Sequence, residues 1–246
     1  MTMTQKDIQF RQFQIRKFNR RRMVPAVNMT IRIEADKMLD LKERWNTHDA
    51  RREHITVTHV ILKAIADTLA RYPVLYSYFD RGRIVANGEL VMNIPVDVES
   101  HVEYIVIHAP ETKSLEEIAT ECRKEIGLIR AGKGTYFKFI TFMTDMSLFT
   151  KLGYLFNHGK VYAFMQENYG NFPVSNFGSF HINSGTVTLS QPMIGGLCIG
   201  AIEKEESRQL FSLTLTFDHR AVDGAYGGKF LNEVKMLLEQ PGQLIK

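Results

Sequence analysis

Hydrophobic residues alternate with polar ones at the start of the regularly patterned part of the chain, which predicts a half-buried strand. The alternating residues are Val27, Met29, Ile31 and Ile33. Behind Asp36, which we expect to cap a helix, the hydrophobic positions change to helical spacing. Those positions are Met38, Leu39, Leu41 and Trp45. The first predicted unit is therefore a strand followed by a helix.

Three more segments have hydrophobic residues at helical spacing. One is expected to begin at a Thr58 cap and to end before Pro73. Another begins with Ser114 and Glu117, which have the spacing of a capping box, and its hydrophobic stripe continues to Gly132. The last is predicted from Tyr226 to Glu239, directly before Pro241. Each of these helices should pack one face against a sheet.

The remaining patterned segments are rich in strand-forming residues. Residues 89–110 are interrupted near Glu99 to His101 and predict two strands or one bent strand. Three more β-rich pieces cover residues 171–180, 184–205 and 208–220. The mixed order of elements favours an α+β sheet layered with helices, and the absence of a repeat or a linker favours a single domain.

Composition narrows the class of protein. The 246 residues are 44% hydrophobic, which is enough for a sizeable core. No apolar run of membrane-spanning length and no secretory leader is visible, so we expect a cytoplasmic protein without a membrane span. Cys122 and Cys198 are the only cysteines, too few for a zinc cluster, and we expect both to be buried and no metal to be bound.

Charge is modest, with a net value of +4, but basic residues gather near the N-terminus. The cluster is Arg16, Lys17, Arg20, Arg21 and Arg22. We interpret it as a solvated helix face, with attraction of phosphates or of an acidic partner as the alternative. The low net charge and the lack of a nucleic-acid-binding motif argue against a nucleic-acid partner.

The stretch FDHRAVDGAYGG at residues 217–228 holds the strongest candidates for catalytic residues. His219 follows a strand-like alternation and precedes a glycine turn, which presents an imidazole on a rigid support as a general base. Asp223 is expected to pair with a cation from elsewhere or to orient the imidazole directly. Taken alone, the stretch also fits an inert loop histidine, with Asp218 to Arg220 as surface charge.

Residues 215–241, LTFDHRAVDGAYGGKFLNEVKMLLEQP, resemble the C-terminal signature of the acyltransferase component of 2-oxoacid dehydrogenase complexes, Asp-His-Arg-x-x-Asp-Gly followed by a long helix. A related His-x-x-x-Asp-Gly turn occurs in the chloramphenicol acetyltransferase superfamily. Four segments further upstream are also similar to segments of this family, and they follow one another in the family's order. From the N-terminus they are IRKFNRRRM, VTHVILKAIADTLARYPVLYSYFD, SLEEIATE and FPVSNFGSF. The resemblance spans nearly the whole chain.

The resemblance implies a chloramphenicol acetyltransferase-like fold and a base-assisted acyl transfer that needs no metal. His219 would take the proton from a thiol that attacks an acyl thioester such as acyl-CoA, and Ser175 would donate a hydrogen bond to the oxyanion. Asp223 would support the turn, paired with an N-terminal arginine. It also implies a homotrimer, or a higher multiple of trimers, in which the base of one subunit faces the serine of its neighbour.

The chain departs from the family in three places. We expect residues 1–246 to form the catalytic domain alone, with no lipoyl attachment site and no subunit-binding domain. Residues 135–170 are an aromatic-rich insertion, expected to form one or two short helices with an exposed or partner-facing apolar side. SHVEYIVI stands where the family has a Gly-Leu-Val-Val-Pro-Val-like strand near the substrate channel. His158 and His181 are expected to be structural or surface residues.

Three functions remain open at this stage. The leading hypothesis is a transferase that moves an acyl group between CoA and a dihydrolipoyl group on a separate lipoylated carrier protein. The second is a CoA-dependent acetyltransferase that acts on a small-molecule hydroxyl or amine. The third is a non-catalytic core or scaffold protein.

Overall fold

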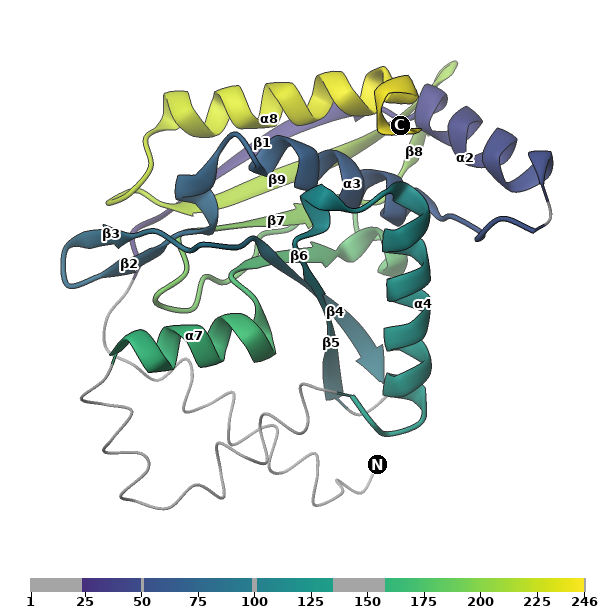
Figure 1. Ribbon diagram of the computed structural model, residues 1–246. Helices are drawn as coiled ribbons and strands as arrows, with labels where there is room; N and C mark the ends of the chain where they lie inside the picture. The colour runs from purple at the N-terminus through teal and green to yellow at the C-terminus, as the bar shows by residue number, and fades with distance from the viewer. Residues whose placement is uncertain (1–23, 50, 99–100, 135–157, 246) are drawn as a thin grey trace, which may run out of the picture.

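A mixed sheet of seven strands forms the centre of the computed structural model, which describes residues 24–49, 51–98, 101–134 and 158–245 (Figure 1). The strand order is β1-β9-β7-β6-β4-β5, with β8 paired to β9, and a separate hairpin contains β2 and β3. The strands are β1 (Ala26–Glu34), β2 (Tyr78–Asp80), β3 (Arg83–Val85), β4 (Val91–Val98), β5 (His101–His108), β6 (Phe172–Asn176), β7 (Gly195–Ile199), β8 (Glu203–Glu205) and β9 (Arg208–Asp218). β4, β6 and β7 run parallel, and the other pairings are antiparallel.

Four long helices cover one face of this sheet, which we call the four-helix face (Figure 1). They are α2 (Asp36–His48), α3 (Val57–Leu69), α4 (Leu115–Arg130) and α8 (Gly224–Glu239). Helix α7 (His158–Tyr169) contacts β4 and β5 on the opposite face. Four short 3-10 turns complete the described elements: η1 (Pro73–Tyr76), η2 (Pro110–Thr112), η3 (Phe177–Phe180) and η4 (Pro241–Ile245).

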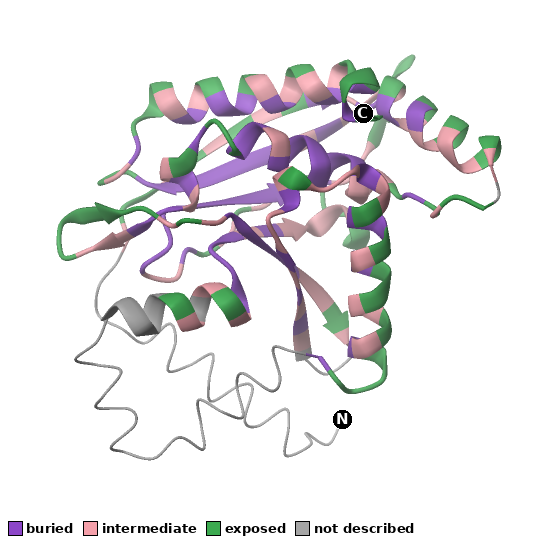
Figure 2. Ribbon diagram, in the orientation of Figure 1, coloured by how far each residue is buried: buried purple, intermediate pink, exposed green. Residues whose placement is uncertain are grey.

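The hydrophobic core lies between the sheet and the four helices, where β7 is buried throughout and β9 over most of its length (Figure 2). On β9, Leu213, Leu215 and Phe217 alternate toward the four-helix face and are fully buried. Phe230 and Val234 of α8 pack into the same core. Burial of each such side chain contributes about 1.5–3 kcal/mol. The central strands are thereby held rigidly up to the residues at which they end.

A polar cluster connects the end of α3 to α8. The Tyr72 hydroxyl donates to Glu233 Oε1 at 2.6 Å, and the Arg71 guanidinium donates to Glu233 Oε2 from Nη2 at 2.7 Å. Burial, together with this hydrogen bond, raises the pKa of Tyr72 to about 12. The cluster stabilises the packing of α3 against α8.

The predicted fold class is confirmed: the chain has a mixed α+β sheet layered with helices. The segment interrupted near Glu99 forms two antiparallel strands, β4 and β5. The capping box at the start of α4 is also confirmed, because Ser114 Oγ accepts the Glu117 N–H and Glu117 Oε2 accepts the Ser114 N–H.

The other two predicted caps are wrong. Helix α3 is capped by Thr56, whose side chain accepts the His59 N–H, while the Thr58 hydroxyl accepts a hydrogen bond from Asn176. Helix α2 has Ala35 at its N-cap and no side-chain cap. Asp36 instead accepts the backbone N–H of Gln209, so its carboxylate connects the helix to β9.

Two predicted segments lie outside the described residues, wholly or in large part. The basic cluster from Arg16 to Arg22 is one, and residues 135–157 of the predicted 135–170 insertion are the other. Helix α7 is the described part of that insertion. Across the parts of the chain that the structure describes, no helix has the length and apolar character needed to cross a membrane.

Candidate active site

His219 stands in a tight turn between the end of β9 and the start of α8. Its backbone N–H donates to Pro25 O at 3.0 Å and so extends the pairing of β9 with the segment of β1. The N–H groups of Ala221 and Val222 both donate to Asp218 O, at 3.0 and 3.1 Å, and close the turn. His219 is exposed, while the Phe217 ring beside it is fully buried.

The orientation of the imidazole is set by a backbone group. His219 Nδ1 lies 2.9 Å from the carbonyl oxygen of Val222. Because a carbonyl can only accept, the proton of a neutral imidazole must reside on Nδ1, and Nε2 is left as the acceptor. The turn therefore presents the ring with a lone pair directed away from the backbone, as a general base requires.

Asp218 and Arg220, which the sequence suggested to be surface charge, form a specific pair. Asp218 is only 1% exposed, and its carboxylate accepts hydrogen bonds from Arg220 Nε at 2.9 Å and from Arg220 Nη2 at 2.6 Å. This bonding raises the pKa of Arg220 further above its ordinary value. The surface-charge interpretation is wrong for Asp218, because its carboxylate is buried and paired with Arg220, whose guanidinium in turn packs on the Phe79 ring of β2.

Asp223 acts as the N-cap of α8. Its side chain accepts the backbone N–H of Tyr226 at 2.8 Å, so the helix begins at Gly224, two residues before the predicted start. The imidazole is oriented by Val222 rather than by Asp223. The predicted ion pair between Asp223 and an N-terminal arginine involves residues outside the described ranges and stays a prediction.

Ser175 lies on β6, two strands away from β9. It pairs in register with Cys198 of β7, which in turn pairs with Thr214 of β9. Its neighbours Phe172 and Val174 belong to the core, so by the alternation of a strand Ser175 points to the opposite face.

The segment after Ser175 lies directly against the end of β7. A Cβ atom placed on Gly178 would come within 2.7 Å of Gly200 O, and Gly200 in turn approaches the carbonyl oxygen of Asn183. Asn176 Nδ2 donates to Thr58 Oγ1 at 2.9 Å and fixes the same segment to the first turn of α3. The serine strand is therefore supported from two sides.

Within one chain the structure does not bring His219 and Ser175 together. His219 lies five residues along β9 from the Thr214 register position, which is about 17 Å, and two strand spacings add about 10 Å across the sheet. The two residues are thus about 20 Å apart. They also occupy positions on opposite faces, because His219 continues the Leu213, Leu215, Phe217 alternation.

The other predicted residues contribute no further reactive group to this turn. Burial raises the thiol pKa of Cys122 to about 12 and that of Cys198 to about 11, so both are neutral thiols. His181 is exposed and has a positive φ of 59° just after η3. His158 starts α7, and its side chain is outside the described set. Among the described side chains no group of three or more His, Cys, Asp or Glu residues is placed to hold a metal ion.

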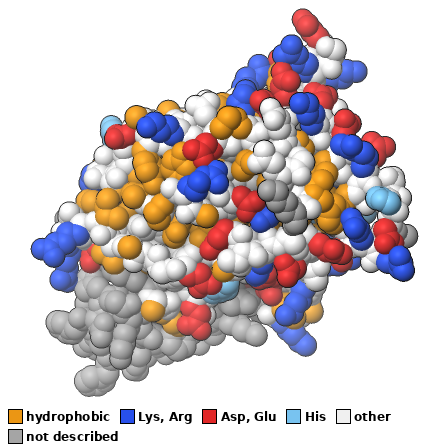
Figure 3. Space-filling view, turned by 45° about the horizontal axis from the view of Figure 1, so that its top comes forward, with side chains coloured by type: hydrophobic (Ala, Val, Ile, Leu, Met, Phe, Trp, Pro, Cys, Tyr) orange, Lys and Arg blue, Asp and Glu red, His pale blue; other side chains and the backbone are white. Residues whose placement is uncertain are grey.

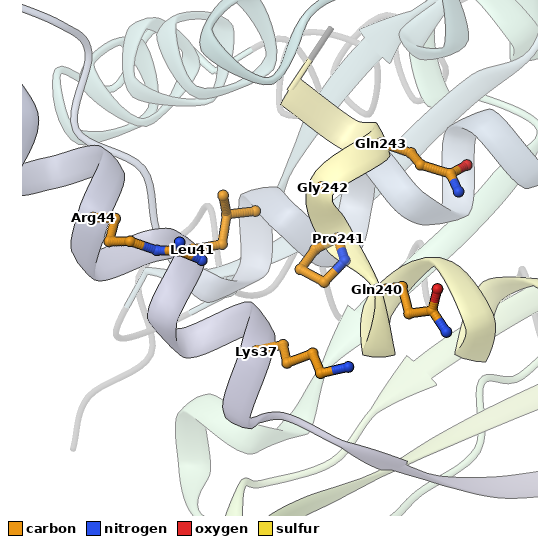
Figure 4. A pocket seen from close by; sticks show the side chains of 7 residues that line it. All are labelled: Lys37, Leu41, Arg44, Gln240, Pro241, Gly242 and Gln243. Atoms are coloured by element: carbon orange, nitrogen blue, oxygen red, sulfur yellow. The ribbon is translucent and has the colours of Figure 1, made fainter.

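A shallow groove of about 380 Å³ lies between α2 and η4 (Figure 4). It is lined by Lys37, Leu41, Arg44, Gln240, Pro241, Gly242 and Gln243. The groove is at the C-terminal end of α8, whereas the His219 turn is at its N-terminal end, about 24 Å away along the helix axis. The groove is therefore separate from the His219 turn. On the face that Figure 3 shows, acidic, basic and hydrophobic side chains are interspersed.

The fold is that of the chloramphenicol acetyltransferase-like proteins. Chloramphenicol acetyltransferase itself superposes with a TM-score of 0.57 at 16% identity over 99% of this chain and 96% of that one. The truncated catalytic core of the 2-oxoacid dehydrogenase multienzyme complex from Thermoplasma acidophilum superposes with a TM-score of 0.74 at 20% identity, covering 98% of each chain. Dihydrolipoamide acetyltransferase from Azotobacter vinelandii gives 0.75 at 17% identity, over 100% and 93% of the two chains.

The chain belongs to the family described as 2-oxoacid dehydrogenases acyltransferase (catalytic domain), which it matches over residues 4–138 and 160–246. The unmatched residues between these ranges fall inside the predicted 135–170 insertion. A curated relative from Bacillus subtilis is the dihydrolipoyllysine-residue acetyltransferase component of the acetoin cleaving system. It is 28% identical over 233 residues, which cover 89% of this chain and 51% of the relative.

A second relative is the corresponding component of the pyruvate dehydrogenase complex of Zymomonas mobilis. It is 23% identical over 229 residues, which cover 89% of this chain and 45% of the relative. The chain therefore spans about half the length of the curated relatives it matches. The match to the family model over most of the chain establishes the family.

Proposed function

We propose that this chain catalyses transfer of an acyl group between CoA and a thiol, with His219 as the general base. The observation that carries the proposal is the 2.9 Å contact between His219 Nδ1 and Val222 O, which leaves Nε2 as a proton acceptor at the exposed edge of a rigid turn. Family membership supplies the reaction class.

The proposed reaction needs only a base and a hydrogen-bond donor. Nε2 of His219 takes the proton of the attacking thiol, and the sulfur forms a bond to the carbonyl carbon of the acyl thioester. The resulting oxyanion accepts a hydrogen bond from the Ser175 hydroxyl. The intermediate then collapses, the departing thiolate takes the proton back from Nε2, and one thioester has replaced another. A positioned base contributes roughly 10²–10⁴ in rate and one oxyanion donor roughly 10²–10³.

Two copies of the chain are required for this mechanism. The separation of about 20 Å between His219 and Ser175 in one chain is far longer than a hydrogen bond. The serine that serves a given histidine must therefore belong to another subunit, which supports the predicted homotrimer with shared sites. A solved relative of the same fold is the cubic core of the pyruvate dehydrogenase multienzyme complex, with a TM-score of 0.74.

The proposed acceptor is a dihydrolipoyl group on a separate carrier protein. The names of both curated relatives specify a dihydrolipoyllysine residue as the acyl acceptor, and the Azotobacter vinelandii relative was studied for the roles of a serine, a histidine and an asparagine in its catalytic mechanism. Acyl-CoA is then a substrate, and Asp223 supports the turn by starting α8. A cytoplasmic location is part of this proposal and stays a prediction.

The test is CoA release from acetyl-CoA and a short panel of other acyl-CoAs, with free dihydrolipoamide as acceptor. Turnover by the unmodified protein should fall at least about 10²-fold in His219→Ala. His48→Ala is the matched control, because His48 is an exposed histidine in the last turn of α2 and its loss should leave turnover unchanged. CoA binding without turnover for the whole panel would instead favour a small-molecule acceptor, and neither binding nor turnover would favour a scaffold.

A further inference from the structure

The residues on either side of His219 are bonded to each other around it. The Asp218 carboxylate accepts the Arg220 backbone N–H at 3.0 Å, and Nε and Nη2 of the same arginine donate to its two oxygens. A buried carboxylate needs such partners, because loss of its counter-charge leaves an uncompensated charge in a poorly solvated place. The bonds therefore fix the backbone at 218 and 220, and the position of His219 between them.

The guanidinium of Arg220 also has a partner on another element. Its Cζ lies 4.4 Å from the centroid of the Phe79 ring on β2. That ring is well anchored, because the Phe79 backbone N–H donates to Pro192 O at 2.7 Å and Tyr78 forms a β-bridge with Met193. The planar cation is thus held by a carboxylate and by an aromatic ring.

These contacts act on the geometry that the base depends on. The Nδ1 contact of His219 requires Val222 O to stand at one place in the turn, and Val222 is held there by its N–H bond to Asp218 O. A shift of Asp218 moves this anchor. Lysine cannot replace the arginine fully, since it lacks the planar fork that bonds two oxygens and stacks on a ring.

We infer that Arg220 is a positioning residue: clamped between the buried carboxylate of Asp218 and the ring of Phe79, it holds the turn that fixes the tautomer and direction of His219. The inference rests on the proposed role of His219 as the base. Arg220 acts through the histidine and makes no contact with the reacting atoms.

A different role for the arginine gives a different kinetic result. The Arg220 side chain is 35% exposed, and an exposed guanidinium is also a good ligand for a phosphate of CoA. Loss of a phosphate contact raises the KM for acyl-CoA and leaves kcat nearly unchanged. Loss of positioning lowers kcat and changes that KM little.

Kinetics of four variants test the inference. In Arg220→Met, kcat should fall between about 10-fold and 10²-fold, the scale expected for a misplaced reacting group, with KM for acetyl-CoA within about twofold. Arg220→Lys should recover part of this loss, and Phe79→Leu, which removes the ring face, should lose a few-fold in kcat. Arg208→Met is the matched control: Arg208 pairs with Glu34 at 2.7 Å at the other end of β9 and should leave kcat unchanged.

A spectroscopic measurement keeps the test independent of turnover. The ¹⁵N shifts of the His219 ring, assigned by their absence in His219→Ala, should show the Nδ1–H form in the unmodified protein and a mixture of tautomers in Arg220→Met. A folded Arg220→Met variant with unchanged kcat and unchanged ring shifts would overturn the inference, and so would a change confined to KM. If His219→Ala itself keeps full turnover, the proposed function fails, and the ring shifts alone then decide the positioning role.

Discussion

Complementation between two inactive variants tests the requirement for two subunits. His219→Ala removes the base and keeps the serine, and Ser175→Ala does the reverse. Since the sheet places the two residues about 20 Å apart in one chain, each site must take its histidine and its serine from different chains. A mixed oligomer of the two variants then contains some sites in which both residues are intact.

The size of the recovery follows from cyclic symmetry. Every trimer that contains both variants, in either ratio, has one interface at which a chain with His219 faces a chain with Ser175. Mixed trimers should therefore show about a third of the unmodified activity, whereas each variant alone should retain at most about 1%.

The assay uses co-expression of the two variants with different affinity tags and tandem purification, so that only mixed oligomers are measured for CoA release. Separately purified variants, combined just before the assay, are the control for activity without subunit exchange. Activity of the tandem-purified protein no higher than the mean of the two variants would show that both residues of a site come from one chain. The placement of the site between subunits would then be wrong.

Three further outcomes follow from individual contacts. Asp223→Ala should lower the free energy of unfolding by about 1 kcal/mol in urea titrations, because α8 loses its cap. Asp223→Asn keeps the cap and should leave the free energy of unfolding nearly unchanged. An equal loss in both variants would show that the charge of the carboxylate matters instead of the cap. Tyr72→Phe should cost about 1 kcal/mol at pH 8 through the bond to Glu233. Because the folded pKa of Tyr72 is raised from 10 to about 12, this advantage is complete below pH 10 and should decline as the pH rises to 12, and a constant difference in unfolding free energy across that range would contradict the assignment. Cys122 and Cys198 should react with a thiol reagent at pH 8 at least about 10²-fold more slowly than free cysteine, and at full rate in denaturant; fast labelling of the native protein would refute their burial.

Much of the fold follows from local pattern. The alternation of residues 27–33 and the capping box at Ser114 specify their elements with little help from the rest of the chain. The cap of α3 was assigned to Thr58, whereas the structure has a local capping box between Thr56 and His59. That cap could have been found from neighbouring residues, but the hydrogen bond of Thr58 to Asn176, which is remote in sequence, could not.

The site was predictable only in part. His219 could be found from its motif, and a cap signal was present at Asp223, since aspartate before a helical segment is a preferred N-cap. The burial of Asp218 had no local signal, because Asp-His-Arg has the composition of a charged loop, and the contact between Arg220 and Phe79 forms only in the folded chain. Likewise, the distance between His219 and Ser175 depends on the order of strands, which only the folded sheet defines.

The close approach of Gly178 to the backbone at Gly200 also determines how sequence changes will be tolerated. A Cβ atom on Gly178 would meet Gly200 O at 2.7 Å, so a substitution there must shift the segment that follows Ser175 away from the end of β7. A Cβ atom on Gly200 would meet Asn183 O at 2.0 Å, so a substitution there must displace the segment around Asn183. Gly88 and Gly242, by contrast, have open space where a side chain would begin. In a library of single substitutions, the glycines should therefore divide into two groups, with Gly178 and Gly200 among those that accept no replacement.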